Sequence, residues 1–172
     1  RCEILPCDLS ELSTLDAVTD RALSLFGRID IAFLNAGISQ RTKVLDTSPQ
    51  VDQKIMDLNF FAPTMIARRL LPPMIAQGGG TIAVTSSIAG RFGFPLRSAY
   101  ASSKFALYGF FETLQAEYHD DGIRVVMVCP GRVQTQISFN ALEGDGKKHG
   151  RMDEGQQNGI TAEKAARKIV KA

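Results

Sequence analysis

The sequence predicts an α/β fold, a Rossmann-like doubly wound parallel sheet with helices on both faces. Short apolar runs alternate with longer segments of helical periodicity along the chain. Each apolar run is followed by polar or glycine-containing residues, and ligands of such folds bind outside the carboxyl ends of the strands. With 172 residues, 44% of them hydrophobic, the chain is expected to form a single domain over residues 1–172.

The composition narrows the class of protein. The net charge is +2 and there is no block of Lys and Arg, so nucleic acid is not an expected partner. Cys2, Cys7 and Cys129 are too few for a disulfide framework and lack zinc spacing, so we expect free thiols, no metal and a cytoplasmic location. No apolar run is long enough to span a membrane. An N-terminal anchor outside the given sequence stays open, because the chain begins with Arg1.

The first elements are two strands with a helix between them. Residues 3–7 are expected to form an edge strand, because they include a proline. A helix capped by Ser10 or Ser13 follows and ends at Gly27. Residues 29–34 are continuously apolar, which indicates a strand buried on both faces.

A long helix is expected over residues 47–77, beginning at Thr47 with a proline in its first turn. Asn59 is a poor helix former, and Pro63 lacks the N–H that would bond the Asn59 carbonyl. We therefore expect a kink here, with a free carbonyl that could hold a water. The apolar side is predicted to comprise Ile55, Leu58, Phe61, Met65, Ile66 and Leu70.

The second half continues the alternation of strands and helices. Residues 143–159 are rich in glycine and charge, so they are expected to form a mobile loop near the substrate. The other expected elements are strands at 81–85 and 123–129, and helices at 98–118, 134–142 and 161–171.

Hydroxyl and amine groups gather around the end of the third apolar run. Ser86 and Ser87 close that run, and Tyr100 and Lys104 are one helical turn apart on one face. An ammonium beside a phenol favours the phenolate, which predicts a pKa for Tyr100 below its usual value of about 10. A serine hydroxyl at the same place could hold a substrate oxygen. The residues therefore predict a proton-transfer site and leave the choice of serine open.

Six motifs follow one another along the chain, and in this order they resemble the classical short-chain dehydrogenases/reductases. Residues 92–100 and 105–107 are similar to the hydroxysteroid-dehydrogenase-like branch of that family. One position departs from the family, which commonly has Asn where this chain has Leu34. The motifs are Asp8-Leu9, Leu34-Asn35-Ala36-Gly37, Asn59, Ser86-Ser87, Tyr100-x-x-x-Lys104 and Pro130-Gly131-Arg132-Val133-Gln134-Thr135.

The resemblance implies an NAD(P)-dependent oxidoreductase that interconverts a secondary alcohol and a ketone or aldehyde by hydride transfer. Its proton relay would comprise Ser87, Tyr100, Lys104 and Asn59, because the family's serine lies thirteen positions before its tyrosine. The substrate would be a small carbonyl or alcohol, with a bulky apolar compound as one option. A homodimer or homotetramer is implied, with the helices at 47–77 and 98–118 between subunits.

The resemblance also implies a cofactor, NADP or NAD, with NADP favoured. Asp8 and Leu9 would approach its adenine. The remaining cofactor contacts would be Asn35, Ala36 and Gly37 at the adenine ribose, Tyr100 and Lys104 at the nicotinamide ribose, and Pro130, Gly131, Val133 and Thr135 at the nicotinamide.

The sequence departs from the family at its ends. The family opens with a strand, a glycine-rich turn and a helix that binds the pyrophosphate. That segment is absent here, as is a last strand after Lys171. In the family's strand order, 3-2-1-4-5-6, the two absent strands lie between residues 3–7 and 29–34. We therefore expect part of a longer enzyme, which alone binds dinucleotide poorly.

Two other functions are weighed against this one. A catalytically silent relative would use the fold as a binding or assembly module, and the missing pyrophosphate turn favours it. An epimerase or dehydratase of the extended type would share Tyr100 and Lys104, but the segment from Pro130 to Thr135 favours the classical type.

Overall fold

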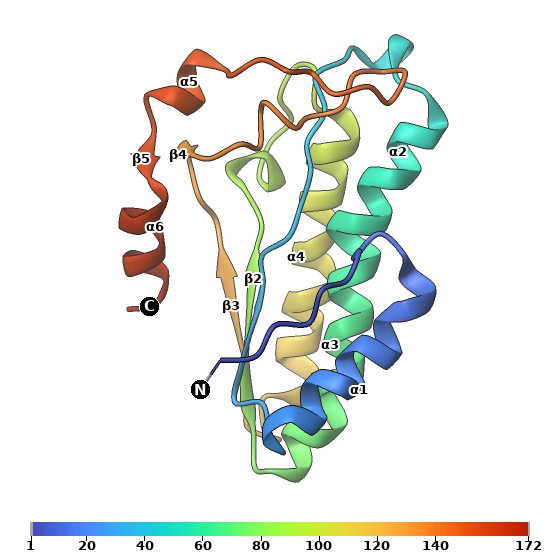
Figure 1. Cartoon of the computed structure of the whole chain (residues 1–172). Helices are drawn as coiled ribbons and strands as arrows, with labels where there is room; N and C mark the ends of the chain where they lie inside the picture. The colour runs from blue at the N-terminus through green and yellow to red at the C-terminus, as the bar shows by residue number, and fades with distance from the viewer. Residues whose placement is uncertain (1, 172) are drawn as a thin grey trace.

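The computed structural model describes residues 2–171. Its centre is a parallel sheet of three strands in the order β1-β2-β3 (Figure 1). The prediction of a Rossmann-like parallel α/β fold is confirmed. The strands are β1 (Ile31–Leu34), β2 (Gly80–Thr85) and β3 (Ile123–Val128).

The long helices cover one face of this sheet. They are α1 (Leu15–Phe26), α3 (Ala62–Ala76) and α4 (Ser98–Tyr118), while α6 (Ala162–Ile169) lies on the other side of the strands (Figure 1). The main core fills the space between the long helices and the sheet. Its fully buried members are Ala67, Leu70, Leu71, Met74, Ile82, Val84, Leu107, Phe111, Leu114 and Ile123.

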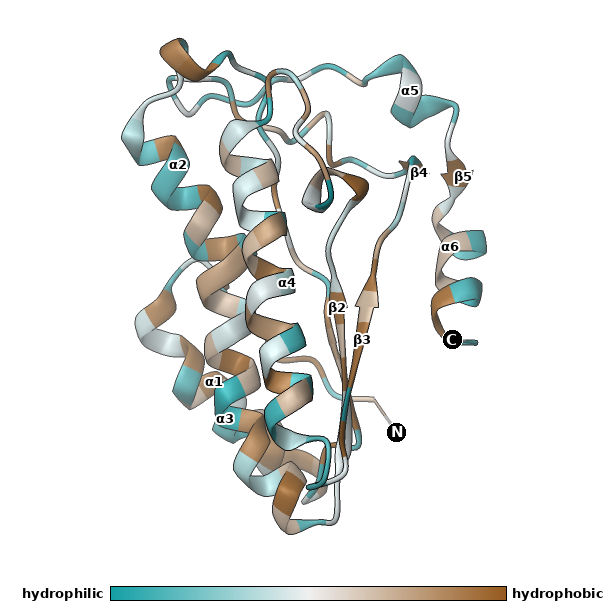
Figure 2. Ribbon diagram, turned by 180° about the vertical axis from the view of Figure 1, so that it is seen from behind, coloured by the Kyte–Doolittle hydropathy of each residue, from teal (hydrophilic) through white to brown (hydrophobic). Residues whose placement is uncertain are grey.

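Two smaller apolar clusters lie apart from the main core. One contains Val51, Ile55, Ala99 and Leu142, and the other contains Ala89, Tyr100 and Ala101. Hydropathy differs between elements inside and outside the main core. β3, which contributes to the main core, is mostly hydrophobic, whereas α5 (Glu154–Gln157), which has no buried residue, is mostly hydrophilic (Figure 2).

The remaining elements are short. β4 (Val133–Gln134) and β5 (Ile160–Thr161) pair in parallel as a second, separate sheet. They are accompanied by α2 (Pro49–Met56), a π-helical turn (Asp57–Phe61) and three 3-10 turns (Leu12–Thr14, Val44–Asp46 and Ile88–Gly90).

Two predictions about strands are wrong. Residues 3–7 form no strand, and Ile4 is 83% exposed, because no strand among the described residues lies beside this segment to complete a ladder. β1 is not buried on both faces, since Ile31 and Phe33 are 56% and 54% exposed. They point to the face of the sheet that the long helices leave uncovered.

The helix predicted over residues 47–77 forms as α2, the π-helical turn and α3. The π-helical turn occurs where the proline and the asparagine predicted a kink. Its extra residue rotates the positions that follow, so Ala67 and Met74 are buried and Phe61 is 40% exposed. The predicted apolar side is therefore wrong at Phe61, whereas Leu70 is buried in the main core and Ile66 packs against it as predicted.

Some helix termini and one short helix also differ from expectation. Ser48, rather than Thr47, caps α2 by accepting the Val51 N–H. Neither Ser10 nor Ser13 caps α1, although Gly27 ends it in the left-handed conformation with φ of 76°. The helix predicted over residues 134–142 does not form, because its first residue pairs in β4 and the rest follow turns.

The described residues hold three free cysteines, all exposed. Across residues 2–171 there is no group of side chains that could hold a metal ion. Within the same range, none of the helices has the length and apolar character needed to cross a membrane.

Candidate active site

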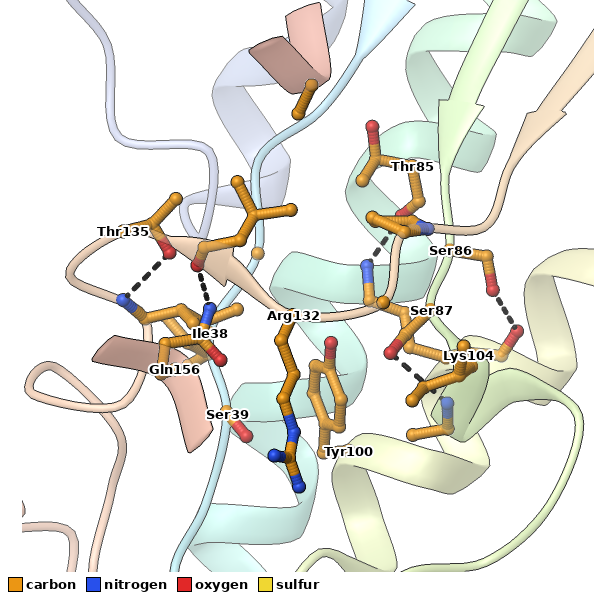
Figure 3. A pocket seen from close by; sticks show the side chains of 18 of the residues that line it. Ile38, Ser39, Thr85, Ser86, Ser87, Tyr100, Lys104, Arg132, Thr135 and Gln156 are labelled. Carbon is orange, nitrogen blue, oxygen red and sulfur yellow. Dashed lines mark hydrogen bonds between the residues drawn. The ribbon is translucent and has the colours of Figure 1, made fainter. Parts of the chain in front are cut away.

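Tyr100 and Lys104 lie one turn apart at the start of α4, and both side chains are buried. Ser87 follows β2 and begins the turn Ile88–Gly90. All three side chains line one cavity of about 840 Å³ (Figure 3). The structure thus brings the hydroxyl, phenol and amine of the predicted site to one place.

The two serines at the end of β2 have different environments. Ser86 is 2% exposed and donates its hydroxyl to the Lys104 carbonyl at 3.1 Å. Gly90 permits this close packing, because a Cβ there would lie 2.6 Å from the Ser86 hydroxyl. The Ser87 oxygen accepts the Ala89 N–H at 3.1 Å, and its hydroxyl interacts with the Tyr100 phenol. This geometry favours Ser87 as the serine that would meet a substrate.

Lys104 combines burial with a single backbone contact. Its Nζ donates to the Thr85 carbonyl at 2.7 Å and stands 5.9 Å from the centre of the Tyr100 ring. The side chain is 3% exposed, and burial lowers the pKa of its ammonium to about 8. Lys104 is therefore still mostly charged at neutral pH but loses its charge at a lower pH than an exposed lysine does.

Burial raises the pKa of the Tyr100 phenol above its ordinary value. Hydrogen bonding to Ser87 and the charges of Arg41 and Arg97 oppose this effect but do not reverse it. The predicted lowering of the Tyr100 pKa is therefore wrong for this structure. Sequence spacing could indicate the neighbouring Lys104 but not how strongly the phenol is buried. At neutral pH the phenol carries its proton.

Asn59 lies in the π-helical turn and is 1% exposed. Its Oδ1 accepts the Ile38 N–H at 2.9 Å, and its Nδ2 donates to the Ile38 carbonyl at 2.9 Å and to the Ser103 hydroxyl at 3.0 Å. The side chain therefore fixes the loop after β1 against α4. A Cβ on Gly37 would lie 3.1 Å from the Asn59 Oδ1 and 3.4 Å from the Lys104 Nζ, so glycine allows this close approach.

The segments that follow the strands meet at the cavity, as expected for a parallel sheet. Asp8 and Leu9 are not among the residues that line it, and Asp8 instead accepts two hydrogen bonds from Ser10, at 2.9 and 2.7 Å. Their assignment to an adenine site stays a prediction. The predicted cofactor residues that do line the cavity are Asn35, Ala36, Gly37, Tyr100, Lys104, Pro130, Gly131, Val133 and Thr135.

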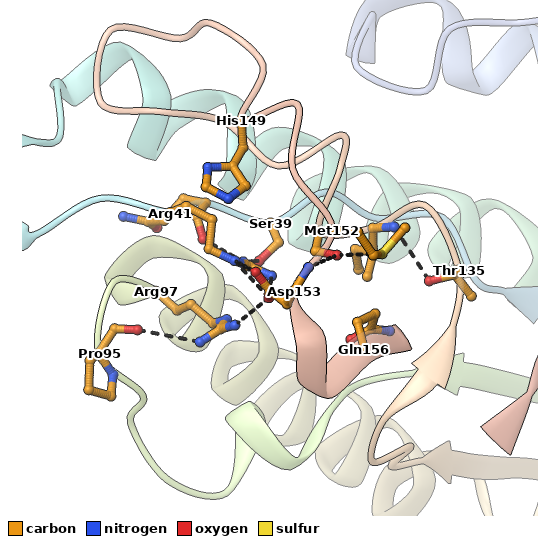
Figure 4. A network of polar contacts seen from close by, with 12 residues as sticks. Ser39, Arg41, Pro95, Arg97, Thr135, His149, Met152, Asp153 and Gln156 are labelled. Atoms are coloured by element: carbon orange, nitrogen blue, oxygen red, sulfur yellow. Dashed lines mark hydrogen bonds and ion pairs between the residues drawn. The ribbon is translucent and has the colours of Figure 1, made fainter. Parts of the chain in front are cut away.

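A network of charges beside Tyr100 was not predicted from the sequence. The buried Arg41 binds the Asp153 carboxylate through Nε at 3.0 Å and Nη2 at 2.5 Å, and Arg97 binds it at 3.0 Å (Figure 4). The side chain of Arg41 is 6% exposed. Only the position of Arg97, three residues before Tyr100, could have indicated any of this, because the other contacts join residues far apart in sequence.

The segment over residues 143–159 crosses this network. Asp153 joins this segment to Arg41 through their ion pair. Within the segment, His149 Nδ1 lies 2.6 Å from Glu143 Oε1. Asp153, Gly155 and Gln156 of this segment line the cavity. Its predicted place near the substrate is consistent with these contacts, and its mobility stays a prediction.

The fold and the site define the class of protein to which the chain belongs. A sequence model of the family described as short chain dehydrogenase matches residues 1–145. The chain belongs to the short-chain dehydrogenase family.

Among curated relatives, the chain is similar to proteins named dehydrogenase/reductase SDR family member 7B and dehydrogenase/reductase SDR family protein 7-like. It is 41% identical over 165 residues to member 7B of Xenopus tropicalis, covering 96% of this chain and 53% of that protein. It is 39% identical over 167 residues to a protein 7-like of Drosophila melanogaster, covering 97% of this chain and 51% of that protein. The chain thus spans about half the length of the curated relatives it matches.

Solved structures give the same result. A short-chain dehydrogenase from Streptomyces avermitilis matches with a TM-score of 0.86 at 29% identity, covering 98% of this chain and 64% of that one. A putative NAD(P)-dependent gluconate 5-dehydrogenase from Beutenbergia cavernae, with bound NADP at low occupancy, matches with a TM-score of 0.76 at 29% identity. That alignment covers 79% of this chain and 54% of the dehydrogenase.

Proposed function

We propose that this chain carries the catalytic part of an NAD(P)-dependent oxidoreductase that interconverts a secondary alcohol and a ketone or aldehyde. The observation that carries the proposal is the meeting of Ser87, Tyr100 and Lys104 in the cavity that the strand-end segments also line. Three of the similar solved structures are described with NADP and one with NADH, which supports an NAD(P) cofactor here, with NADP the more frequent of the two.

Tyr100 is the general acid of the reduction and the general base of the oxidation. Because burial raises the pKa of its phenol, the phenol is protonated at neutral pH and ready to donate to a carbonyl oxygen. In the oxidative direction it must first lose that proton, so the rate of oxidation should rise with pH. Ser87 holds the substrate oxygen beside the phenol through its hydroxyl, which interacts with Tyr100 when no substrate is bound.

Lys104 and Asn59 complete the relay. The Lys104 ammonium has three N–H donors, one of which binds the Thr85 carbonyl. The Asn59 side chain is occupied by Ile38 and Ser103, so its main-chain carbonyl is the group that remains to hold a water. Pro63 cannot donate to that carbonyl, because it lacks an N–H.

The cavity fits the nicotinamide and ribose part of a dinucleotide. Gly37 lets the backbone after β1 approach Asn59 and Lys104 at the wall of the cavity, because a Cβ there would crowd both side chains. Pro130, Gly131, Val133 and Thr135 form another part of the wall. Lys104 and Tyr100 would hold the ribose there. The dinucleotide supplies or accepts the hydride when bound. Apolar wall residues such as Ile88, Phe94 and Ile137 are compatible with a bulky apolar substrate.

The proposal is tested on the full-length protein by following the absorbance of NADH and NADPH with ketones, aldehydes, secondary alcohols and steroids. We expect turnover with at least one carbonyl or alcohol class, and faster turnover with the NADP pair. Cofactor binding without turnover of any class would instead support a catalytically silent binding module.

Replacing Tyr100 tests the assignment of the proton donor. Tyr100→Phe should lower kcat by about 100- to 10,000-fold, since it removes the acid and base while leaving the ring in place. The dissociation constant of the cofactor should change little. Tyr108→Phe, which removes a buried phenol oxygen two turns further along α4, is the matched control and should keep kcat near that of the wild type. An unchanged kcat in Tyr100→Phe would remove Tyr100 from its role.

A further inference from the structure

The first turn of α4 is held by a side chain from a distant loop. Arg97 precedes the helix but makes no side-chain capping hydrogen bond. The Oε1 of Gln40 instead accepts the backbone N–H of Ala99 at 2.8 Å and that of Tyr100 at 3.2 Å. These N–H groups have no partner within the helix, so Gln40 caps α4 from outside it.

The environment of Gln40 determines the orientation of its amide. The side chain is fully buried, and its Nε2 donates to the hydroxyls of Thr47 and Ser98, both at 3.1 Å. The Thr47 hydroxyl itself donates to the Lys43 carbonyl, so it can only accept from Nε2. Since backbone N–H groups can only donate, Oε1 must face α4. Each polar atom of the amide therefore has two partners.

Gln40 also joins the site to the segment over the cavity. Its carbonyl accepts a hydrogen bond from Arg41 Nη1 at 2.6 Å, and Gln40 forms an isolated bridge with Leu142. Arg41 in turn binds Asp153 (Figure 4). Gln40 therefore both caps α4 and contacts Arg41, the residue that pairs with Asp153 in the segment over residues 143–159.

We propose that Gln40 is a positioning residue for Tyr100, because its amide fixes the backbone from which the phenol projects toward Ser87. The inference rests on the proposed role of Tyr100. Without the amide, two N–H groups at a buried helix start would lack partners, and the first turn would shift or fray. A displacement of about 1 Å in a reacting group can lower a rate by about 100-fold.

Gln40→Met tests this proposal, because it keeps the length of the side chain and removes its hydrogen bonds. We expect kcat to fall about 10- to 100-fold, with the dissociation constant of the cofactor within about twofold of the wild type. Ser48→Ala is the matched control, since Ser48 caps α2 rather than α4. It should lower the melting temperature without changing kcat. In Gln40→Glu, one carboxyl oxygen can still accept both N–H groups although the donation to Thr47 is lost, so kcat should fall less than in Gln40→Met.

A second readout does not depend on turnover. In protein labelled with ζ-¹³C tyrosine, the Tyr100 resonance, assigned with Tyr100→Phe, should shift and change its titration in Gln40→Met but not in Ser48→Ala. If the wild type is inactive, the proposed function fails, while this resonance still tests the positioning. If Gln40→Met does not fold, Gln40→Asn, whose amide is one methylene too short, takes its place with the same expectation. An unmoved resonance and an unchanged kcat would overturn the proposal, as would equal kcat losses in the Met and Glu variants.

Discussion

Lys104 shows what burial does to a charged side chain in this site. Its pKa is about 8 in the fold, against about 10.4 in an unfolded chain. The unfolded state therefore binds more protons between these values, so the free energy of unfolding rises with pH across that interval. Below about pH 8 the protein carries the whole cost of holding a buried ammonium.

Lys104→Met should remove this cost. The variant should gain stability relative to the wild type at pH 7, and that gain should shrink by about 2 kcal/mol between pH 7 and pH 10. Urea unfolding at the two pH values, without added cofactor, measures the difference. Lys43→Met, at an exposed position, is the control and should show no such change. A gain that is equal at both pH values would contradict the lowered pKa. With cofactor, the variant should bind it more weakly and turn over more slowly.

Individual residues differ in how well the sequence predicts them. Tyr100 and Lys104 were predicted to share one face because their spacing is local, whereas Ser87 was chosen over Ser86 only through the family resemblance. Gln40 and Asp153 were missed, because the contacts of Gln40 with α4 and of Asp153 with Arg97 and Arg41 join residues 56 to 112 positions apart. Nothing in the sequence around a glutamine indicates that it caps a distant helix.

Asp153 acts at the level of elements, since it joins the segment over residues 143–159 to the loop after β1 and to α4. Partial burial raises the pKa of its carboxyl. The hydrogen bond from Arg41 and the charges of Arg41 and Arg97 lower that pKa by more than burial raises it, so the pKa of Asp153 lies below its usual value. Its ion pairs therefore contribute stability at neutral pH. That contribution is lost as the pH falls below about 4, through the lowered pKa.

Asp153→Asn should destabilise the protein by about 2 kcal/mol at pH 7, because two guanidinium groups lose their carboxylate. The loss should shrink as the pH falls toward the lowered pKa of Asp153, where the wild-type carboxylate takes up a proton. Urea unfolding from pH 7 to pH 3 follows both effects. Asp145→Asn in the same segment is the matched control, since Asp145 pairs with the exposed Lys147, and it should unfold like the wild type. An equal loss in both variants would argue against a specific role for the network.

Elements were predicted well where the hydrophobic period is regular. The helix over residues 98–118 was predicted with its observed bounds, and all three strands of the main sheet were found. The exposure of Phe61 and the burial of Ala67 and Met74 were not predicted, because an unbroken period of 3.6 residues cannot represent the extra residue of a π-helical turn. Residues 3–7 form no strand because no strand of the described residues pairs with them. The residue pattern within a segment does not show whether another strand lies beside it.

At the scale of the whole molecule, we expect self-association through α3 and α4. Phe61 and Phe105 are 40% and 45% exposed on this helical layer, which supports the proposed homodimer or homotetramer. Phe61→Glu combined with Phe105→Glu should reduce the mass measured by light scattering to that of a monomer. Leu45→Glu, at a 97% exposed position, should leave the mass unchanged. A monomeric wild type would rule out the proposed assembly.

The separation of the three apolar clusters has a consequence for how the protein would lose activity on heating. The main core joins α3, α4, β2 and β3, whereas Tyr100 belongs to a cluster of three buried residues and Gln40 lies beside a cluster of four. The catalytic end thus has little apolar burial of its own and depends on polar contacts for its shape. It can open locally while the core stays folded. We therefore expect loss of activity on heating to be distinct from melting and to precede it.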